Sequence, residues 1–254
     1  MKVLPPGTIL QLTYLEERLQ QIIPGHFIEI GPGSGEITSL LLKQGWTGTV
    51  IDYQDTTIEG INNRFPTEIQ SGRLKTMIGD YLSASFIQKA NLIISCMVIE
   101  HLNDTEEQAF MNKASTLLAE HGLMIGLVPS CPAYWGIEDE IAGHYRRYTR
   151  DSIQQLTERN GWKLKHLSGL TYPVSNILFP VSNFLVKRSE AHKLKLSKLD
   201  QTKLSGQRKV PFKTSFPSVL GLILNKHLLL PLHWLQKACS GSQKAMVLYF
   251  EATT

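Results

Sequence analysis

The spacing of apolar residues divides the chain into alternating helix and strand patterns. Residues 8–23 place isoleucine or leucine at positions 9, 12, 15, 19, 22 and 23, the spacing of one helix face. Short apolar runs, typical of buried strands, then alternate with helical stretches. The runs that predict strands are His26–Ile30, Thr47–Asp52, Leu74–Ile78, Asn91–Cys96 and Leu123–Val128. This alternation is typical of a parallel, doubly wound sheet.

Glycine and proline mark where the intervening helices end. The predicted helices are Glu36–Gln44 with Gly45 as its C-cap, Ile58–Phe65 before Pro66, and the amphipathic segment Thr105–Glu120, capped by Asp104 or Thr105 and followed by Gly122. After Pro129 the pattern changes, and we expect a loop as far as about Arg147. The remaining predicted elements are a helix over Thr149–Asn160, closed by Gly161, and strands over Trp162–Leu170 and Lys244–Glu251.

Residues 171–242 do not follow the strand–helix rhythm. Two apolar stretches, Leu170–Val186 and Phe216–Leu235, flank the basic segment Lys187–Lys213. The second stretch is nearly long enough to cross a bilayer, but Asn225-Lys226-His227 and Pro231 interrupt it and argue against a simple span. Either these residues form a helical lid with a polar connector, or they dock on an anionic membrane and admit a lipid-linked acceptor.

Charge is unevenly distributed along the chain. The formal net charge is +4, yet Lys187–Lys213 holds nine Lys or Arg against two acids, so the rest of the chain is net negative. The basic segment lacks interleaved aromatic residues, and we expect no nucleic-acid partner. The three cysteines lie far apart without metal-ligand spacing, so we expect reduced thiols and no metal site. We therefore expect a cytoplasmic protein, which would be peripheral at the membrane if the insertion docks there. Residues 1–13 show no apolar signal-peptide core.

The most informative motif is a glycine loop, Glu29-Ile-Gly31-Pro32-Gly33-Ser-Gly35, directly after a predicted strand and before a helix. Glycines let the backbone turn sharply and approach a ligand, and a helix N-terminus favours an anionic group. A dinucleotide fingerprint would need glycine at the position of Glu36. The spacing therefore does not favour a nicotinamide cofactor.

With an acid before G-x-G-x-G, the chain resembles the class I S-adenosylmethionine-dependent methyltransferases over residues 26–170 and at the final strand. The resemblance implies that Asp52 holds the two ribose hydroxyls of S-adenosylmethionine, that Asp80 accepts from the adenine amine and that Tyr81 packs on the adenine ring. Asn91 departs mildly from the family, which often has aspartate there. The residues implied in cofactor binding are Glu29, Gly31, Pro32, Gly33, Gly35, Asp52, Tyr53, Asp80, Tyr81 and Met97.

Two further motifs point to the methyl acceptor. Glu100-His101-Leu102 resembles the "EHL" of small-molecule members, and Gly143–Tyr148 resembles a "GHxRRY" segment of a branch that serves glycan, lipid and secondary-metabolite pathways. Histidine suits a general base for a hydroxyl acceptor, so the catalytic candidates are His144 and His101. The alternatives are that His144 orders its loop by bonding a carbonyl and that His101 starts a helix. The substrate-binding candidates are Glu100, Tyr145, Arg146, Arg147 and Tyr148.

The adjacent arginines suggest a division of labour. One could clamp a carboxylate or phosphate, while the other pairs with the acids of Glu138–Glu140. Ser95–Val98 stand where methyltransferases of nucleobase or protein amide nitrogens often carry an Asn/Asp-Pro-Pro-aromatic motif. An oxygen acceptor is therefore favoured over nitrogen or carbon.

These observations predict an α/β fold: a Rossmann-like methyltransferase sheet of seven strands, mostly parallel with the last antiparallel, and an α-helical C-terminal insertion. The expected domains are residues 1–170 with 243–254, which bind S-adenosylmethionine, and a helical lid or insertion over 171–242. We expect methyl transfer to a small-molecule, glycan or lipid-linked oxygen by a monomer or weak dimer. The alternatives are a non-catalytic methyltransferase-like module at a membrane or partner surface and an aminopropyl transferase, for which no convincing set of polyamine-binding acids is found.

Overall fold

The computed structural model describes residues 3–205, 210–214 and 216–254, and its chain forms two compact units. The first, the sheet unit, comprises residues 18–128, 150–167 and 249–254. The second, the helical unit, comprises the described residues within 1–17, 129–149 and 168–248. Arg208 and Lys209 of the basic segment lie outside the described residues.

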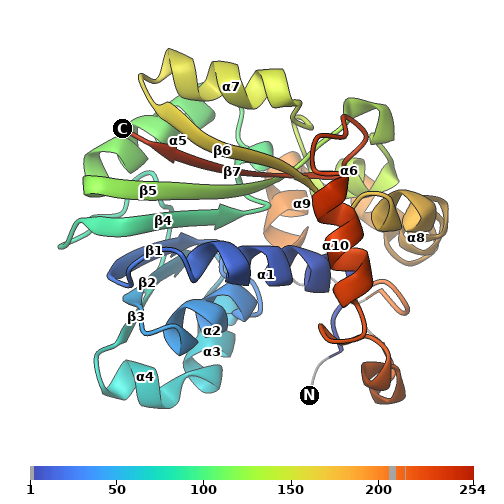
Figure 1. Cartoon of the computed structure of the whole chain (residues 1–254), viewed down its shortest axis with the longest axis horizontal. Helices are drawn as coiled ribbons and strands as arrows, with labels where there is room; N and C mark the ends of the chain where they lie inside the picture. The colour runs from blue at the N-terminus through green and yellow to red at the C-terminus, as the bar shows by residue number, and fades with distance from the viewer. Residues whose placement is uncertain (1–2, 206–209, 215) are drawn as a thin grey trace. The chain divides into compact units, whose positions relative to one another are not determined.

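A seven-stranded sheet, in the order β3-β2-β1-β4-β5-β7-β6, forms the core of the sheet unit. The strands are β1 (His26–Ile30), β2 (Thr47–Asp52), β3 (Leu74–Ile78), β4 (Ala90–Cys96), β5 (Leu118–Pro129), β6 (Lys163–Leu170) and β7 (Val247–Thr253). The neighbours among β3, β2, β1, β4 and β5 are paired in parallel, whereas β7 runs opposite to β4 in Figure 1. The predicted methyltransferase sheet with an antiparallel last strand is confirmed.

The central strands are apolar along most of their length because helices cover both faces of a parallel sheet. Phe27 and Ile28 of β1, Val50 of β2 and Ile93 and Ile94 of β4 have no exposed surface. The helical elements of the sheet unit are α2 (Glu36–Lys43), α3 (Asp55–Arg64), α4 (Pro66–Gln70), η1 (Ile99–His101), α5 (Asp104–Leu117) and α7 (Arg150–Arg159). Burial on both faces of the sheet thus accounts for the strand runs seen in the sequence.

The predicted ends of the helix over 105–120 are wrong. Its N-cap is Asn103, whose side chain accepts from the backbone N–H groups of Thr105 and Glu106 at 3.0 Å each. The Glu106 carboxylate in turn accepts from the Asn103 N–H at 2.9 Å, which completes a capping box. At the other end, the helix stops at Leu117 because Leu118 already belongs to β5 and pairs with Ala90.

Smaller corrections concern two other helix ends. The C-cap of α2 is Gln44, with Gly45 one position beyond it at φ +91°. Pro66 ends α3 as expected, but it also opens α4, since proline is well placed in a first helical turn. The structure therefore contains a helix that the sequence pattern did not predict.

The helical unit contains η2 (Pro132–Tyr134), α6 (Ile137–Ala142), α8 (Val174–Glu190), η3 (Ala191–Lys195), α9 (Lys198–Ser205), η4 (Ser218–Leu222), α10 (Leu230–Ala238) and most of α1 (Pro6–Leu19). The helical character predicted for the insertion is confirmed. The segment expected as a loop from Pro129 to Arg147 instead contains η2 and α6. Within the described residues, no helix combines the length and hydropathy needed to cross a membrane.

A buried polar network joins α10 to α1 within this unit. His233 has no exposed surface, and its Nε2 lies 2.8 Å from Glu17 Oε1. Gln236 donates to the Leu10 carbonyl at 3.0 Å and accepts from the Thr171 N–H at 2.9 Å. These bonds satisfy polar groups that would otherwise be costly to bury.

Candidate functional site

The carboxyl ends of β1, β2, β3 and β4 bring the predicted cofactor residues to one edge of the sheet. Ile30 at the end of β1 pairs with Ile51 of β2 and Ser95 of β4, while Asp52 pairs with Ile78 of β3. The residues that follow these strand ends therefore share one edge, where open α/β sheets bind ligands.

The three glycines of the loop share a left-handed backbone conformation but differ in how much space surrounds them. Gly31, Gly33 and Gly35 all have positive φ, at +69°, +52° and +77°. A Cβ on Gly31 would lie 2.8 Å from Val98 Cγ2, and one on Gly35 would lie 2.7 Å from Ile61 Cδ1, whereas one on Gly33 would meet no protein atom within 4 Å. Gly33 thus borders a space that the protein does not fill, which fits a loop that cradles a ligand.

Gly33→Ala is expected to abolish measurable S-adenosylmethionine binding because the added methyl group would fill this cradle. Gly72→Ala is the matched control, since Gly72 also has a positive φ of +74° and open space around its Cα. Both variants should lose about 1 kcal/mol of stability from backbone strain. Thermal unfolding and calorimetric titration check the two effects, and equal cofactor affinity in both variants would contradict the assignment.

Glu29, the acid before the loop, is 3% exposed. Its Oε2 accepts from the Thr38 hydroxyl of α2 at 2.6 Å, so the carboxyl group ties β1 to that helix. Burial raises the pKa of Glu29 to about 7, against the smaller lowering effect of the Thr38 bond. The structure thus gives Glu29 a structural bond between β1 and α2. Contacts of Glu29 and of the buried Pro32 with the cofactor stay predictions.

Asp52, Tyr53 and Asp80 stand at the ends of β2 and β3. Asp52 is half-buried, and its Oδ1 accepts from the Gln54 N–H at 2.8 Å. Burial raises the pKa of Asp52 more than this bond lowers it. The Tyr53 hydroxyl donates to Asp80 Oδ1 at 2.9 Å, which brings two predicted cofactor residues into direct contact.

The two tyrosines at this edge differ in what they offer a ligand. Tyr81 is 4% exposed, and its ring packs 4.9 Å from that of Phe110, so little of its surface remains for an adenine ring. Tyr53 is 49% exposed. Tyr53 is therefore the better placed aromatic surface, although the sequence pointed to Tyr81 for stacking.

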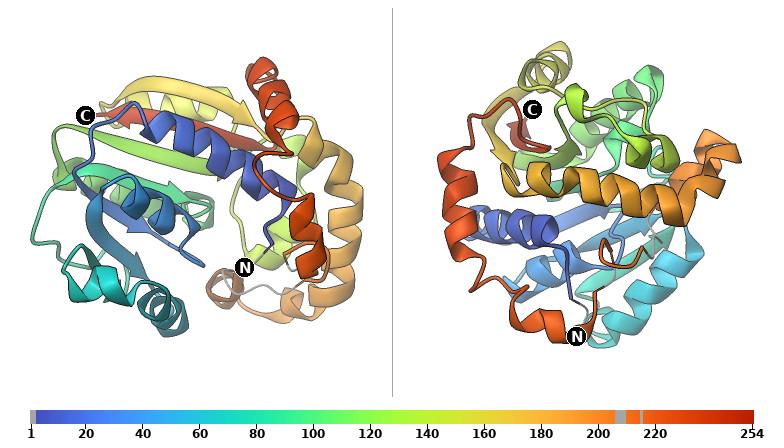
Figure 2. Two further views of the ribbon diagram at one scale, coloured as in Figure 1. Left: turned by 60° about the horizontal axis from the view of Figure 1, so that its bottom comes forward. Right: turned by 90° about the vertical axis from the view of Figure 1, so that its right-hand side faces the viewer.

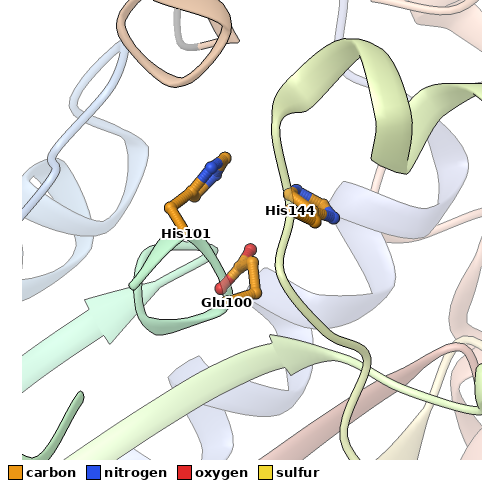
Figure 3. A group of neighbouring side chains, drawn as sticks. All are labelled: Glu100, His101 and His144. Carbon is orange, nitrogen blue, oxygen red and sulfur yellow. The ribbon is translucent and has the colours of Figure 1, made fainter. Parts of the chain in front are cut away.

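Beyond β4 the chain turns through Met97, which has a positive φ of +56°, into η1. Such a backbone conformation is unfavourable for methionine, and strain of this kind clusters at active sites and ligand-binding turns. Burial, followed by the charges of Glu100 and Glu29, raises the pKa of the Cys96 thiol to about 12, so this thiol stays protonated at neutral pH. Glu100 is fully buried and His101 half-buried, and Figure 3 shows both on this turn.

In the helical unit, the predicted acceptor segment is organised around Asp139 of α6. Asp139 has no exposed surface, and its Oδ1 lies 2.8 Å from His144 Nδ1 and accepts from Arg147 Nε at 2.9 Å. Its Oδ2 accepts from the Gly136 N–H at 2.9 Å. His144 stands on the chain just after α6 (Figure 3). The sequence had named Asp139 only as one of three neighbouring acids, and no motif marked it.

The other predicted acceptor-binding residues differ in their burial and in their partners. Arg147 is the arginine that pairs with a local acid, as expected for one of the two, and it also donates to the Ser130 carbonyl at 3.0 Å. Tyr148 is buried and anchors the chain, because its N–H donates to the Pro129 carbonyl at 2.8 Å. Tyr145 is 43% exposed, with Lys198 Nζ 3.9 Å from its ring centre. The acceptor-clamping role of Arg146 stays a prediction.

The sheet order and glycine loop define the class I S-adenosylmethionine-dependent methyltransferases, so the predicted class of enzyme and its cofactor are confirmed. A family model described as a methyltransferase domain matches residues 11–167, more than half of the chain, and the chain therefore belongs to that methyltransferase family.

Individual relatives are distant. The glycopeptide N-methyltransferase MtfA, solved with S-adenosyl-L-methionine, aligns over 96% of this chain and 86% of its own, with a TM-score of 0.56 and 11% identity. The N-methyltransferase NodS from Bradyrhizobium japonicum WM9 aligns over 65% of this chain and 85% of its own, with a TM-score of 0.52 and 21% identity. These similarities show the shared fold.

A curated relative matches only a short stretch of the sequence. A probable ribosomal RNA small subunit methyltransferase A from Methanospirillum hungatei JF-1 is 40% identical over 53 residues, which is 21% of this chain. The chain spans about a fifth of the length of that relative.

Proposed function

We propose that this methyltransferase methylates an oxygen atom of a small-molecule, glycan or lipid-linked acceptor, and that His144 is its general base. The observation that carries the proposal is the hydrogen bond between His144 Nδ1 and the buried Asp139 carboxylate. A methyl group on a sulfonium is already activated, so the protein chiefly supplies alignment and, for a hydroxyl acceptor, a base.

The Asp139 carboxylate sets the proton on the histidine ring. Because a carboxylate only accepts, Nδ1 of a neutral His144 would carry the proton in this bond, and Nε2 would keep a lone pair. Burial raises the pKa of Asp139. The hydrogen bonds from His144 and Arg147, together with the charge of Arg147, lower it by more than burial raises it, so the pKa is below its ordinary value. An ionised Asp139 would then stabilise the imidazolium formed when Nε2 takes the acceptor proton.

The cofactor residues would hold S-adenosylmethionine, which supplies the methyl group. Gly33 would leave room for the ligand, Asp52 would accept from the ribose hydroxyls and Asp80 would accept from the adenine amine. Tyr53 is the exposed ring that would pack against adenine. This assignment rests on the fit of donors, acceptors and open space at the strand ends.

His144→Ala is expected to lower methyl transfer by about a hundredfold or more, the usual contribution of a general base, without changing S-adenosylmethionine affinity. The measurement is transfer of labelled methyl groups to a panel of glycan, lipid-linked and small-molecule hydroxyls. His121→Ala is the matched control because its side chain is 91% exposed on β5. Methylation of amines alone, or full activity of His144→Ala on hydroxyls, would contradict the proposal.

A further inference from the structure

Helix α8 presents an apolar face to solvent. Ile177, Val181 and Phe184 are 73%, 58% and 62% exposed. Their spacing of four and three residues places them on one face of the helix, and the exposed Arg188 continues the same row four residues further on. We call this row the outer stripe of α8.

The opposite face of α8 packs against the rest of the helical unit. Val186 is buried in a cluster with Ile141 and Val210. The ring of Phe179 meets that of Tyr134 edge-on at 5.2 Å, and Ser182 Oγ lies 3.5 Å from Glu138 Oε2. A surface helix ordinarily turns its apolar face inward and its polar face to water. The outer stripe reverses this arrangement in a helix whose packing face is already defined.

Positive charge adjoins the stripe. Lys187 and Arg188 are exposed in the last turn of α8, and Lys195 and Lys198 are exposed just beyond it. Glu190 is paired with Lys193 and Asp200 is exposed, so five cations over residues 187–200 outnumber two acids. In Figure 2, where α8 is the gold helix, the chain continues from this basic end into η3 and α9. The stripe therefore combines apolar surface with a cationic end.

We propose that the outer stripe of α8 docks on the surface of an anionic lipid bilayer. Ile177, Val181 and Phe184 would enter the boundary between headgroups and acyl chains, while Lys187 and Arg188 bind the lipid phosphates. Charge complementarity selects this occupant over a second copy of the chain, which would bring the same excess of positive charge. The inference goes beyond the proposed oxygen acceptor and does not rest on it, because docking requires neither cofactor nor acceptor.

The test is flotation of the purified full chain with phosphatidylcholine vesicles that contain or lack phosphatidylglycerol. We expect binding to the anionic vesicles only, weakened by salt because surface charges are screened. Ile177→Gln with Phe184→Gln removes two apolar anchors, and Lys187→Gln with Arg188→Gln separately removes two charges that bind lipid phosphates. Each double variant should lower vesicle affinity about tenfold or more.

Matched controls remove similar side chains elsewhere. Ile23→Gln with Ile87→Gln removes two isoleucines that are 88% and 99% exposed, and Lys89→Gln with Lys163→Gln removes two exposed lysines. Both control pairs should bind vesicles as the unaltered chain does. Failure of the folded chain to bind anionic vesicles, or equal binding by the stripe variants, would overturn the proposal. A dimer in sedimentation equilibrium that the Ile177/Phe184 variant dissociates, without vesicle binding, would assign the stripe to a second copy instead.

Discussion

Replacing Asp52 by alanine is expected to weaken S-adenosylmethionine binding at least about a hundredfold, because two charge-assisted hydrogen bonds to the ribose are lost, each contributing about 1.5–3 kcal/mol. The fold should change little. Asp52 is the last residue of β2, and its carboxylate accepts from the N–H of Gln54, the residue just before α3. Calorimetric titration measures the affinity, and thermal unfolding checks the fold.

Two further variants separate the role of Asp52 in cofactor binding from its hydrogen bond to the Gln54 N–H. Asp52→Asn keeps an oxygen that can accept from Gln54 but has lost the charge, so it should bind the cofactor weakly while unfolding as the parent does. Asp55→Ala removes an exposed acid three residues later and should leave affinity unchanged. Because burial raises the pKa of Asp52, acidification should weaken binding at a higher pH than for an ordinary aspartate. Unchanged affinity in Asp52→Ala would remove this residue from the site.

Asp139→Asn is expected to destabilise the helical unit by about 3–5 kcal/mol, the usual cost of removing one partner of a buried ion pair. Arg147, whose side chain is 6% exposed, would lose the carboxylate that neutralises it. His144 would lose the negative charge that stabilises its protonated ring, so methyl transfer by the remaining folded protein should fall as well. Urea unfolding measures the first effect, and turnover below the unfolding midpoint measures the second.

The stability that Asp139 contributes through its ion pair with Arg147 depends on pH in a defined way. The pKa of Asp139 is lowered in the folded chain, so between that pKa and the ordinary value of 3.8 the unfolded chain binds more protons. Its stabilising contribution is therefore complete above about pH 4–5 and is lost as the pH falls through the folded pKa. Asp139→Asn should lack this acid-side loss. Glu140→Gln, which alters the exposed neighbour, should keep it, and an identical acid response in both variants would contradict the account.

The strands were the most predictable elements because their signals are local. The bounds of β1, β2 and β3 coincide with the apolar runs. In β1 and β2, burial on both faces of the sheet leaves few polar interruptions. Helix ends were less predictable. The helical periodicity after Thr105 continues past Leu117, and only the pairing of Leu118 with Ala90 decides that the chain there is a strand.

The residues of the candidate site likewise divide into those that the sequence could predict and those that it could not. The glycine loop and Asp52 could be found because their residue types follow strand ends, where the chemistry of the ligand restricts the sequence. Asp139 could not, because its importance comes from the fold of a six-residue helix that brings it to His144 and Arg147. Three adjacent acids before a histidine and two arginines were the only signal. The burial of Tyr81 likewise depends on Phe110, 29 positions away in the sequence.

The most direct test of the central claim is calorimetric titration of the folded chain with S-adenosylmethionine, S-adenosylhomocysteine and NAD in parallel. The account predicts that both sulfur ligands bind at one site per chain and that NAD does not bind. Failure of the folded chain to bind either sulfur ligand, or binding of NAD at the same site, would contradict it.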